Sequence, residues 1–200
     1  NPFIDLYEKA LLPSESWENY NLVGISIVGI SQILPGLTLA RLLKEKYPHL
    51  HITLGGPIFS VNANQLVDHP KFFKEFCHSI VTFEGEEPLH RLLTTLKNGS
   101  TLKDVPNLLF YEDGKVELNE ERVELRFEEM PPPTFDGLPM DLYLSPYPIL
   151  PVLQSRGCYW GKCTFCTHSF IYGHRYGKQR TEQMVDELES LGEKYKTKYF

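Results

Sequence analysis

The sequence lacks the excess of basic residues that nucleic-acid-binding proteins need. Its 200 residues carry 20 Lys and Arg against 26 Asp and Glu, a formal net charge of -6 at pH 7. We therefore expect no nucleic-acid partner, because binding to phosphates depends on clustered positive charge. No apolar run approaches the roughly 20 residues that span a bilayer, so we expect no membrane association. Residues 1–5 lack the basic start of a secretory signal, which favours a cytoplasmic protein.

Cysteine is scarce and unevenly placed. Three of the four cysteines, Cys158, Cys163 and Cys166, fall within nine residues. Disulfide frameworks of secreted proteins spread their cysteines to close loops, whereas this clustering indicates a metal site in a reducing compartment. Cys77 stands alone, and free cysteine is commonly a small buried hydrophobe, so we expect it in the core.

Acidic residues are missing around the three cysteines. The stretch from Arg156 to Thr181 contains no Asp or Glu, although the chain as a whole is acidic. Positive surroundings keep thiolates ionised, and they would also attract a ligand that bears a carboxylate. A solvated basic loop would have the same composition, so charge alone leaves both interpretations open. The basic residues of this stretch are Arg156, Lys162, Arg175, Lys178 and Arg180.

The first half of the chain alternates strands and helices. Continuous runs of β-branched and apolar residues predict strands buried on both faces at 22–28, 51–54 and 79–83. Apolar residues at helical spacing predict one helix between Pro35-Gly36 and Pro48 and another over about 86–97. This rhythm is typical of an α/β domain with a flavodoxin-like, or Rossmann-like, parallel sheet.

Ligands bind such sheets at the carboxyl ends of the strands. Those ends are 26–29, 55–56 and 84–86 in this chain, and glycine at several of these positions lets a ligand approach the backbone. A flavodoxin-like domain that binds nothing would show the same pattern, because a fold does not fix a function.

The second half begins with a predicted hairpin and a proline-rich stretch. Asp113-Gly114 between two short apolar runs predicts a hairpin over 108–118. Three consecutive prolines then begin a stiff linker at 130–148, because proline fits neither a helix interior nor a central strand. A short strand at 149–154 leads to the cysteines, and a helix over 181–196 follows with Met184, Val185, Leu188, Leu191 and Tyr195 as its apolar stripe.

Three kinds of metal site fit three clustered thiolates. A structural zinc could use the three cysteines with His168, but closed zinc sites usually have two separated pairs of ligands. An electron-transfer cluster normally has four cysteines. A cluster with three protein ligands leaves one iron open for a substrate, as a catalytic site requires.

The segment 155–166 resembles the signature of the radical S-adenosylmethionine enzymes. The commonest pattern of that family has three residues between the first two cysteines, and this chain has four, a spacing found in subfamilies with a cobalamin domain. The resemblance implies a [4Fe–4S] cluster in which Cys158, Cys163 and Cys166 each bind one iron. The fourth iron would chelate S-adenosylmethionine, with Phe165 against its adenine, and electron transfer would yield a 5′-deoxyadenosyl radical.

The domain before the linker resembles the cobalamin-binding domain that often precedes this signature. Ser26-Ile27-Val28 approximates the Ser-x-Leu of that family, Gly55-Gly56 matches its Gly-Gly, and Glu84-Gly85-Glu86-Glu87 matches part of its Gly-Glu-Gly-Glu turn. The resemblance implies that Ser26, Gly55, Gly56, Glu84 and Gly85 surround the nucleotide tail of cobalamin. The Asp-x-His-x-x-Gly motif, whose His ligates cobalt in some relatives, is absent, and so are the first strand and helix of such a domain.

The resemblance predicts three parts. Residues 1–129 form the cobalamin-binding-like domain, 130–148 the Pro-rich linker, and 149–200 the beginning of a truncated radical S-adenosylmethionine (β/α) barrel. Since later cofactor contacts would lie beyond Phe200, we expect this N-terminal segment alone to be inactive.

The implied activity is methyl transfer to an unactivated carbon. The substrate would be a small molecule or a peptide, since residues 157–162 are similar to members that modify ribosomal peptides, and flavodoxin or ferredoxin would donate the electron. Two alternatives stay open: a non-catalytic interaction module with zinc or a cluster, and a cobalamin-binding accessory domain.

Overall fold

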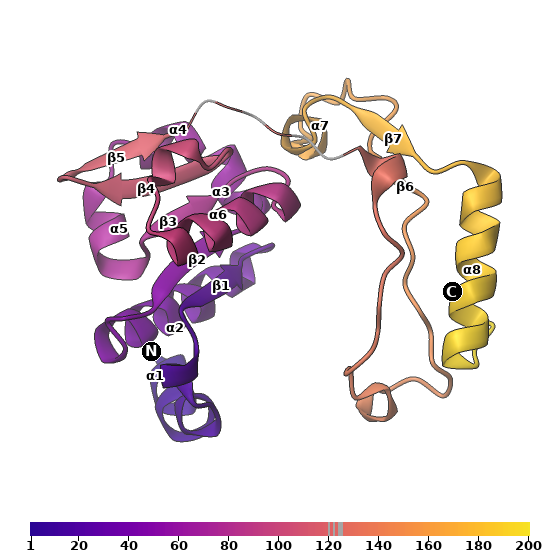
Figure 1. Ribbon diagram of the computed structural model, residues 1–200, viewed down its shortest axis with the longest axis horizontal. Helices are drawn as coiled ribbons and strands as arrows, with labels where there is room; N and C mark the ends of the chain where they lie inside the picture. The colour runs from indigo at the N-terminus through magenta and orange to yellow at the C-terminus, as the bar shows by residue number, and fades with distance from the viewer. Residues whose placement is uncertain (120, 122, 124–125) are drawn as a thin grey trace. The chain divides into compact units, whose positions relative to one another are not determined.

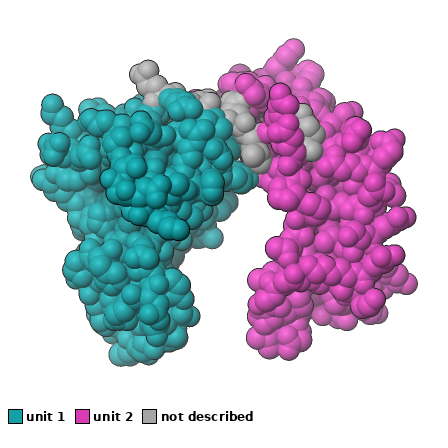
Figure 2. All heavy atoms as spheres, in the orientation of Figure 1, with its two compact units in different colours: residues 1–124 teal, residues 125–200 magenta. Residues whose placement is uncertain are grey.

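The structure is a computed structural model that describes residues 1–119, 121, 123 and 126–200. It divides into two compact units, residues 1–124 and residues 125–200, which Figure 2 colours separately. Among the described residues, no helix has both the length and the apolar character needed to cross a membrane.

Unit 1 is built on a five-stranded sheet (Figure 1). The strands lie in the order β1-β2-β3-β4-β5. Strands β1, β2 and β3 are parallel, β4 pairs antiparallel with β3, and β5 pairs antiparallel with β4. The expected α/β class is confirmed, but the sheet is mixed rather than parallel, because the predicted hairpin joins it. The strand bounds are β1 Leu22–Ser26, β2 His51–Gly55, β3 Ser79–Val81, β4 Leu108–Glu112 and β5 Lys115–Leu118.

Short helices connect these strands. The chain begins with α1, which continues into one π-helical turn at Tyr7–Leu11, and 3₁₀ turns follow at Leu12–Ser14 and Trp17–Asn19. The segment between β2 and β3, which the sequence analysis left without a helix, contains α3, α4 and α5. The helix bounds in unit 1 are α1 Pro2–Leu6, α2 Ile33–Lys46, α3 Pro57–Val61, α4 Ala63–Leu66, α5 Pro70–Phe76 and α6 Glu86–Asn98.

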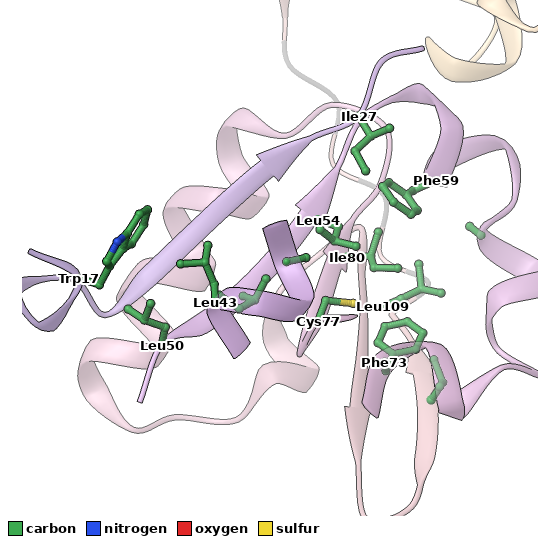
Figure 3. Packing of buried hydrophobic residues seen from close by; sticks show 14 of the residues in the cluster. Trp17, Ile27, Leu43, Leu50, Leu54, Phe59, Phe73, Cys77, Ile80 and Leu109 are labelled. Atoms are coloured by element: carbon green, nitrogen blue, oxygen red, sulfur yellow. The ribbon is translucent and has the colours of Figure 1, made fainter. Parts of the chain in front are cut away.

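Two apolar cores cover the two faces of the sheet. Alternate strand residues divide between them: Ile80 and Leu109 belong to the larger core, whereas Val81, Leu108 and Phe110 belong to the smaller one. Helices α2 and α5 contribute to the larger core, part of which Figure 3 shows, and α6 contributes the buried Leu92 to the smaller one. Cys77 is fully buried in the larger core, as predicted. The residues labelled in Figure 3 are Trp17, Ile27, Leu43, Leu50, Leu54, Phe59, Phe73, Cys77, Ile80 and Leu109.

The prediction that residues 22–28 form a strand buried on both faces is wrong. Among the described strands β1 lies at the edge of the sheet, ends at Ser26, and is only partly buried. Ile27 is buried beyond the strand end, but the side chain of Val28 is 62% exposed. The third predicted strand is also shorter than expected, because β3 ends at Val81.

The break predicted at Pro35-Gly36 is wrong as well. Helix α2 starts at Ile33, so both residues lie in its first turns. Proline is tolerated there because the first backbone N–H groups of a helix have no partner within the helix. The helix does end just before Pro48, at Lys46. Helix α6 matches its prediction closely, with Gly99 as a left-handed cap at φ 65°.

Unit 2 contains the two-stranded antiparallel ladder of β6 (Ser155–Gly157) and β7 (Tyr176–Lys178), the short helix α7 (His168–Ile171), and α8 (Thr181–Tyr195). The predicted strand at 149–154 is wrong in extent: Ile149 makes an isolated parallel bridge with Tyr199, and the regular strand lies closer to Cys158. The bridge places the chain after α8 beside the chain before the cysteines, as in a strand–helix–strand unit.

The predicted linker is tied to α8 by hydrogen bonds. Phe135 is 8% exposed, packs edge-on against the ring of Tyr195, and donates its backbone N–H to the Tyr195 hydroxyl at 2.8 Å. Asp136 accepts hydrogen bonds from that hydroxyl at 2.8 Å and from Lys194 at 2.5 Å. Phe135 thereby forms a small core with Leu150 and Leu191.

The buried side of α8 differs from the predicted stripe at two positions. The side chain of Val185 is 47% exposed, whereas that of Glu187 is 6% exposed. The Glu187 carboxylate accepts a hydrogen bond from the buried amide of Gln179 at 3.0 Å. Hydrophobic periodicity did not identify this polar pair, because a buried carboxylate looks like a surface residue in the sequence.

Candidate cluster-binding loop and sheet-edge cavity

The three clustered cysteines lie on one loop whose two ends are joined by a ladder. β6 enters the loop, β7 leaves it, and the ladder pairs Gly157 with Tyr176. The N–H of Cys158 continues the pairing to the carbonyl of Arg175 at 3.3 Å. Gly157 has φ +88°, and a side chain there would clash with the Arg175 carbonyl, so the ladder requires glycine at this position.

The outer face of the ladder is fixed by Phe127. This residue is 5% exposed and packs on Gly177, where a β-carbon would come within 2.8 Å of Phe127 Cβ. The guanidinium of Arg156 lies over the Phe127 ring, 5.8 Å from its centroid. Both strands that hold the cysteine loop are therefore packed against one aromatic side chain.

All three cysteines are free thiols with access to solvent. Cys158 is partly buried, while Cys163 and Cys166 are exposed. Cys158 Sγ accepts a hydrogen bond from the N–H of Gly161 at 3.5 Å, and the N–H of Cys166 binds the Cys163 carbonyl at 3.3 Å. His168, the candidate fourth zinc ligand, lies with Nε2 3.2 Å from the carbonyl oxygen of Gly157.

The three cysteines lie on one loop without being gathered around a single point. Within the described residues, no three His, Cys, Asp or Glu side chains come together around a point that could hold a metal ion. A structural zinc needs four ligands around one point, whereas in a cluster each thiolate bonds a different iron. Three soft sulfur donors on one loop, one of which already accepts an N–H, are chemically suited to iron–sulfur ligation.

Exposed aromatic residues surround the cysteines. Phe165, the predicted adenine contact, is 88% exposed, and Tyr159 and Trp160 are 82% and 57% exposed. Lys162 lies over the Trp160 ring, 5.4 Å from its centroid, and Tyr159 packs edge-on against Tyr176. The loop thus presents flat apolar rings and positive charge next to its thiols.

A cavity of about 480 Å³ opens where β1, β2 and β3 end in unit 1. Four of the five predicted cobalamin residues line it, namely Ser26, Gly55, Gly56 and Gly85. Glu84 is not among the lining residues; its carbonyl accepts a hydrogen bond from Asn107 at 3.3 Å. The cavity is large enough for part of a cofactor. The rest of its lining comes from Gly24, Ile25, Thr53, Leu54, Val81, Phe83, Glu86 and Leu89.

The shape of this cavity depends on Gly56, which was predicted, and on Phe83 and Leu89, which sequence reasoning missed. Gly56 has φ +109°, and a side chain there would clash with the Ile27 carbonyl, so this glycine lets the two strand ends meet. Phe83 and Leu89 supply apolar walls. Leu89 lies in the helix predicted over about 86–97, and its position in the first turns of α6, next to a strand end, could have identified it.

A buried polar cluster lies at the opposite ends of β2 and β3. His51 Nε2 lies 2.8 Å from Ser79 Oγ, and the His51 and His78 rings are 5.1 Å apart. The pKa of both histidines is lowered to about 4. Burial is the main cause for each; His78 and then Lys44 add to the shift at His51, and Lys44 adds to the shift at His78. Burial also raises the pKa of Cys77 to about 12, although Lys44 acts against this shift. His51, His78 and Cys77 are therefore neutral near pH 7.

Comparison with curated proteins gives two methyl-transferring relatives, while no protein-family model matches the chain. The chain is 30% identical over 180 residues to an uncharacterized methyltransferase of Pyrococcus horikoshii, covering 88% of this chain and 37% of that protein. It is 27% identical over 186 residues to the hopanoid C-3 methylase of Methylococcus capsulatus, covering 86% of this chain and 33% of that protein. The chain therefore spans about a third of the length of these relatives.

Solved structures share the fold across nearly the whole chain. The radical S-adenosylmethionine methyltransferase TsrM from Kitasatospora setae, solved with cobalamin and a [4Fe–4S] cluster, has a TM-score of 0.60 at 19% identity, over 96% of this chain and 39% of its own. The cobalamin-dependent S-adenosylmethionine radical enzyme OxsB, solved with aqua-cobalamin, has a TM-score of 0.67 at 24% identity. The match covers 96% of this chain and 26% of OxsB.

The resemblance stated from the sequence is thus confirmed. The chain shares the fold of cobalamin-dependent radical S-adenosylmethionine enzymes over 96% of its length, and the curated proteins similar in sequence are methyltransferases.

Proposed function

We propose that this chain is part of a radical S-adenosylmethionine enzyme that transfers a methyl group to an unactivated carbon. The observation that carries the proposal is the cysteine loop: three free, accessible thiols between two strands that are joined to each other. The similarity to methyltransferases supports the reaction class. When bound, a [4Fe–4S] cluster supplies the electron that cleaves S-adenosylmethionine and generates the 5′-deoxyadenosyl radical.

We propose a role for five residues of the loop. Cys158, Cys163 and Cys166 hold the cluster, and the Gly161 N–H donates to the Cys158 sulfur and so stabilises its negative charge. Phe165 is exposed and offers a flat apolar surface to the adenine of S-adenosylmethionine. Because the chain carries no Asp or Glu from Arg156 to Thr181, the loop repels neither the thiolates nor a ligand carboxylate.

Cobalamin is the second proposed cofactor. The cavity at the carboxyl ends of β1, β2 and β3 is lined by Ser26, Gly55, Gly56 and Gly85, which the sequence assigned to cobalamin from separate motifs. TsrM and OxsB, whose folds cover 96% of this chain, were both solved with cobalamin. We propose that the cavity receives the nucleotide tail of the cofactor.

The proposed partners follow from this chemistry. The substrate is a small molecule or a peptide, and a one-electron donor such as flavodoxin or ferredoxin reduces the cluster. We place the protein in the cytoplasm, where three accessible thiols are kept reduced.

The decisive experiment is metal analysis of the full-length protein after anaerobic reconstitution with iron and sulfide. We expect about four irons and four sulfides per chain, and loss of both in the variant C158A/C163A/C166A. The variant C77A is the matched control, because it removes the buried cysteine of unit 1 and should keep the full iron content.

Two other results would lead to the alternatives. Stoichiometric zinc without sulfide would contradict the radical enzyme and favour a zinc-stabilised interaction module. Bound corrinoid in a protein that takes up no iron would favour a cobalamin-binding accessory domain.

A further inference from the structure

Phe83 has a backbone conformation that suits glycine rather than phenylalanine. Its φ is +59°, in the left-handed region. For a bulky residue this conformation is an outlier, because the β-carbon crowds the neighbouring carbonyl. Such outliers persist only where the surrounding structure enforces them, and they gather at binding sites.

Hydrogen bonds at Phe83 and at the residues before and after it enforce this conformation. Its backbone N–H donates to the hydroxyl of Ser60 at 2.7 Å, and Ser60 is 1% exposed. The preceding residue, Thr82, donates both its N–H and its hydroxyl to the carbonyl of Asn107, each at 2.9 Å. Asn107, which is 2% exposed, in turn binds the Glu84 carbonyl on the other side of Phe83. The strand end is therefore held on both sides of the strained residue.

The enforced conformation puts Phe83 in the lining of the cavity at the sheet edge. The strands beneath this cavity carry no side chain at Gly24 and Gly55. Neither glycine is required by packing: an added β-carbon would meet its nearest neighbour at 3.7 Å for Gly24 and 3.5 Å for Gly55, ordinary contact distances. Neither has a positive φ. Glycine at these positions therefore keeps space open rather than allowing the chain to fold.

The lining of the cavity thus combines bare strand backbone at Gly24 and Gly55 with the apolar residues Val81, Phe83 and Leu89. Its polar lining residues are Ser26, Thr53 and Glu86. A flat, uncharged heteroaromatic ring fits such a lining, because it can lie on bare backbone and contact an aromatic ring with its own π-system.

We infer that Phe83 determines the specificity of this cavity by contacting the heteroaromatic base of the bound ligand. This inference rests on the proposed cobalamin function, and it identifies the benzimidazole base of the nucleotide tail as the group that Phe83 recognises. The enforced left-handed conformation of Phe83 then places an aromatic residue just beyond the end of β3.

The test compares two corrinoids with the full-length protein: cobalamin, which carries the benzimidazole nucleotide, and cobinamide, which lacks it. We expect F83L to bind cobalamin about tenfold more weakly than the parent, the usual size of an aromatic stacking contact, with cobinamide binding unchanged. F83G should show the same selective loss while its thermal midpoint stays close to that of the parent, because glycine adopts the φ without strain.

Two further variants complete the design. G24V should fold, since the site has room for a β-carbon, but should fill the cavity and weaken cobalamin binding more than cobinamide binding. L93A is the matched control, because Leu93 lies on α6, is 48% exposed, and is not among the cavity-lining residues. Its corrinoid affinities should equal those of the parent.

Equal affinity of parent and F83L for cobalamin, or an equal loss for both corrinoids, would overturn the inference. A parent protein that binds neither corrinoid would contradict the proposed cobalamin function instead. The fluorescence anisotropy of the free benzimidazole nucleoside then tests the cavity alone: an increase with the parent but not with F83L would support the role of Phe83, and no increase with either would refute it.

Discussion

Gly157 and the carbonyl of Arg175 face each other across the β6–β7 ladder so closely that no β-carbon fits between them. Gly157 directly precedes Cys158, the first cysteine of the loop. The ladder, the left-handed φ of +88° and the start of the cysteine loop therefore coincide at one position.

We predict that G157A abolishes iron–sulfur incorporation. The methyl group would push β6 and β7 apart and release the ends of the loop that carries the thiols. After anaerobic reconstitution, iron and sulfide content should fall to background, while far-ultraviolet circular dichroism stays close to that of the parent. G137A is the control: Gly137 also has a positive φ, +81°, but an added β-carbon there has no neighbour within 4 Å. Full iron content in G157A would show that the ladder does not position the cysteines.

Stability should depend on pH through His51 and His78. Both have a folded-state pKa of about 4, below the ordinary 6.5, so the unfolded chain binds more protons than the folded chain between these values. Their contribution is complete above pH 6.5 and is lost as the pH falls towards 4. We expect the free energy of unfolding, measured with urea, to drop by about 2 kcal/mol for each histidine, or about 4 kcal/mol for the pair, between pH 7 and 4.5. The variant H51Q/H78Q should flatten this dependence, and an unchanged slope would argue against buried neutral histidines.

Lys44 should stabilise unit 1 by hydrogen bonding to the end of α5. Its ammonium group donates to the carbonyls of Phe73 and Cys77 at 2.6 and 2.8 Å. Because K44M keeps the length of the side chain but leaves both carbonyls without this donor, we expect it to lower the free energy of unfolding by about 2 kcal/mol. K71M removes an exposed lysine from α5 and should change stability by less than about 0.5 kcal/mol. Similar denaturation midpoints for the two variants would contradict the prediction.

Phe135 should decide whether the proline-rich segment stays attached to α8. Its buried ring packs against Tyr195 and belongs to a small core with Leu150 and Leu191. We expect F135A to lower the free energy of unfolding of unit 2 by about 3 kcal/mol and to expose residues 131–148 to limited proteolysis. F135L retains most of the buried apolar volume and should lose about 1 kcal/mol. Proteolysis at the same rate in F135A and the parent would mean that the segment is held by other contacts.

Local signals predicted those elements whose causes are local. The hairpin turn has a positive φ at both Asp113 and Gly114, as the Asp-Gly pair indicated. Helix α6 has acidic residues in its first turn and a left-handed Gly99 after its last residue, and both signals are visible in the sequence. The spacing of the cysteines likewise placed the three thiols on one loop.

The errors concern features that depend on distant parts of the chain. Whether β1 lies inside or at the edge of the sheet is decided by its neighbours, and a run of apolar residues carries no information about them. Helices α3, α4 and α5 have seven residues or fewer, too short for a helical period to stand out. Phe83 was missed because its conformation follows from Ser60 and Asn107, which lie 23 and 24 residues away in the chain.

The ladder that joins the two ends of the cysteine loop would favour binding of the proposed cluster. Ordering an open chain around a metal centre carries an entropic penalty that grows with the length of the loop to be closed. Here residues 158–175 are already closed by β6 and β7, so much of that penalty falls on protein folding and little on metal uptake. The β6–β7 ladder thus preorganises the two ends of the loop for metal binding. A protein that loses its iron to oxygen would keep this arrangement and be ready for repair as soon as iron, sulfide and reductant return.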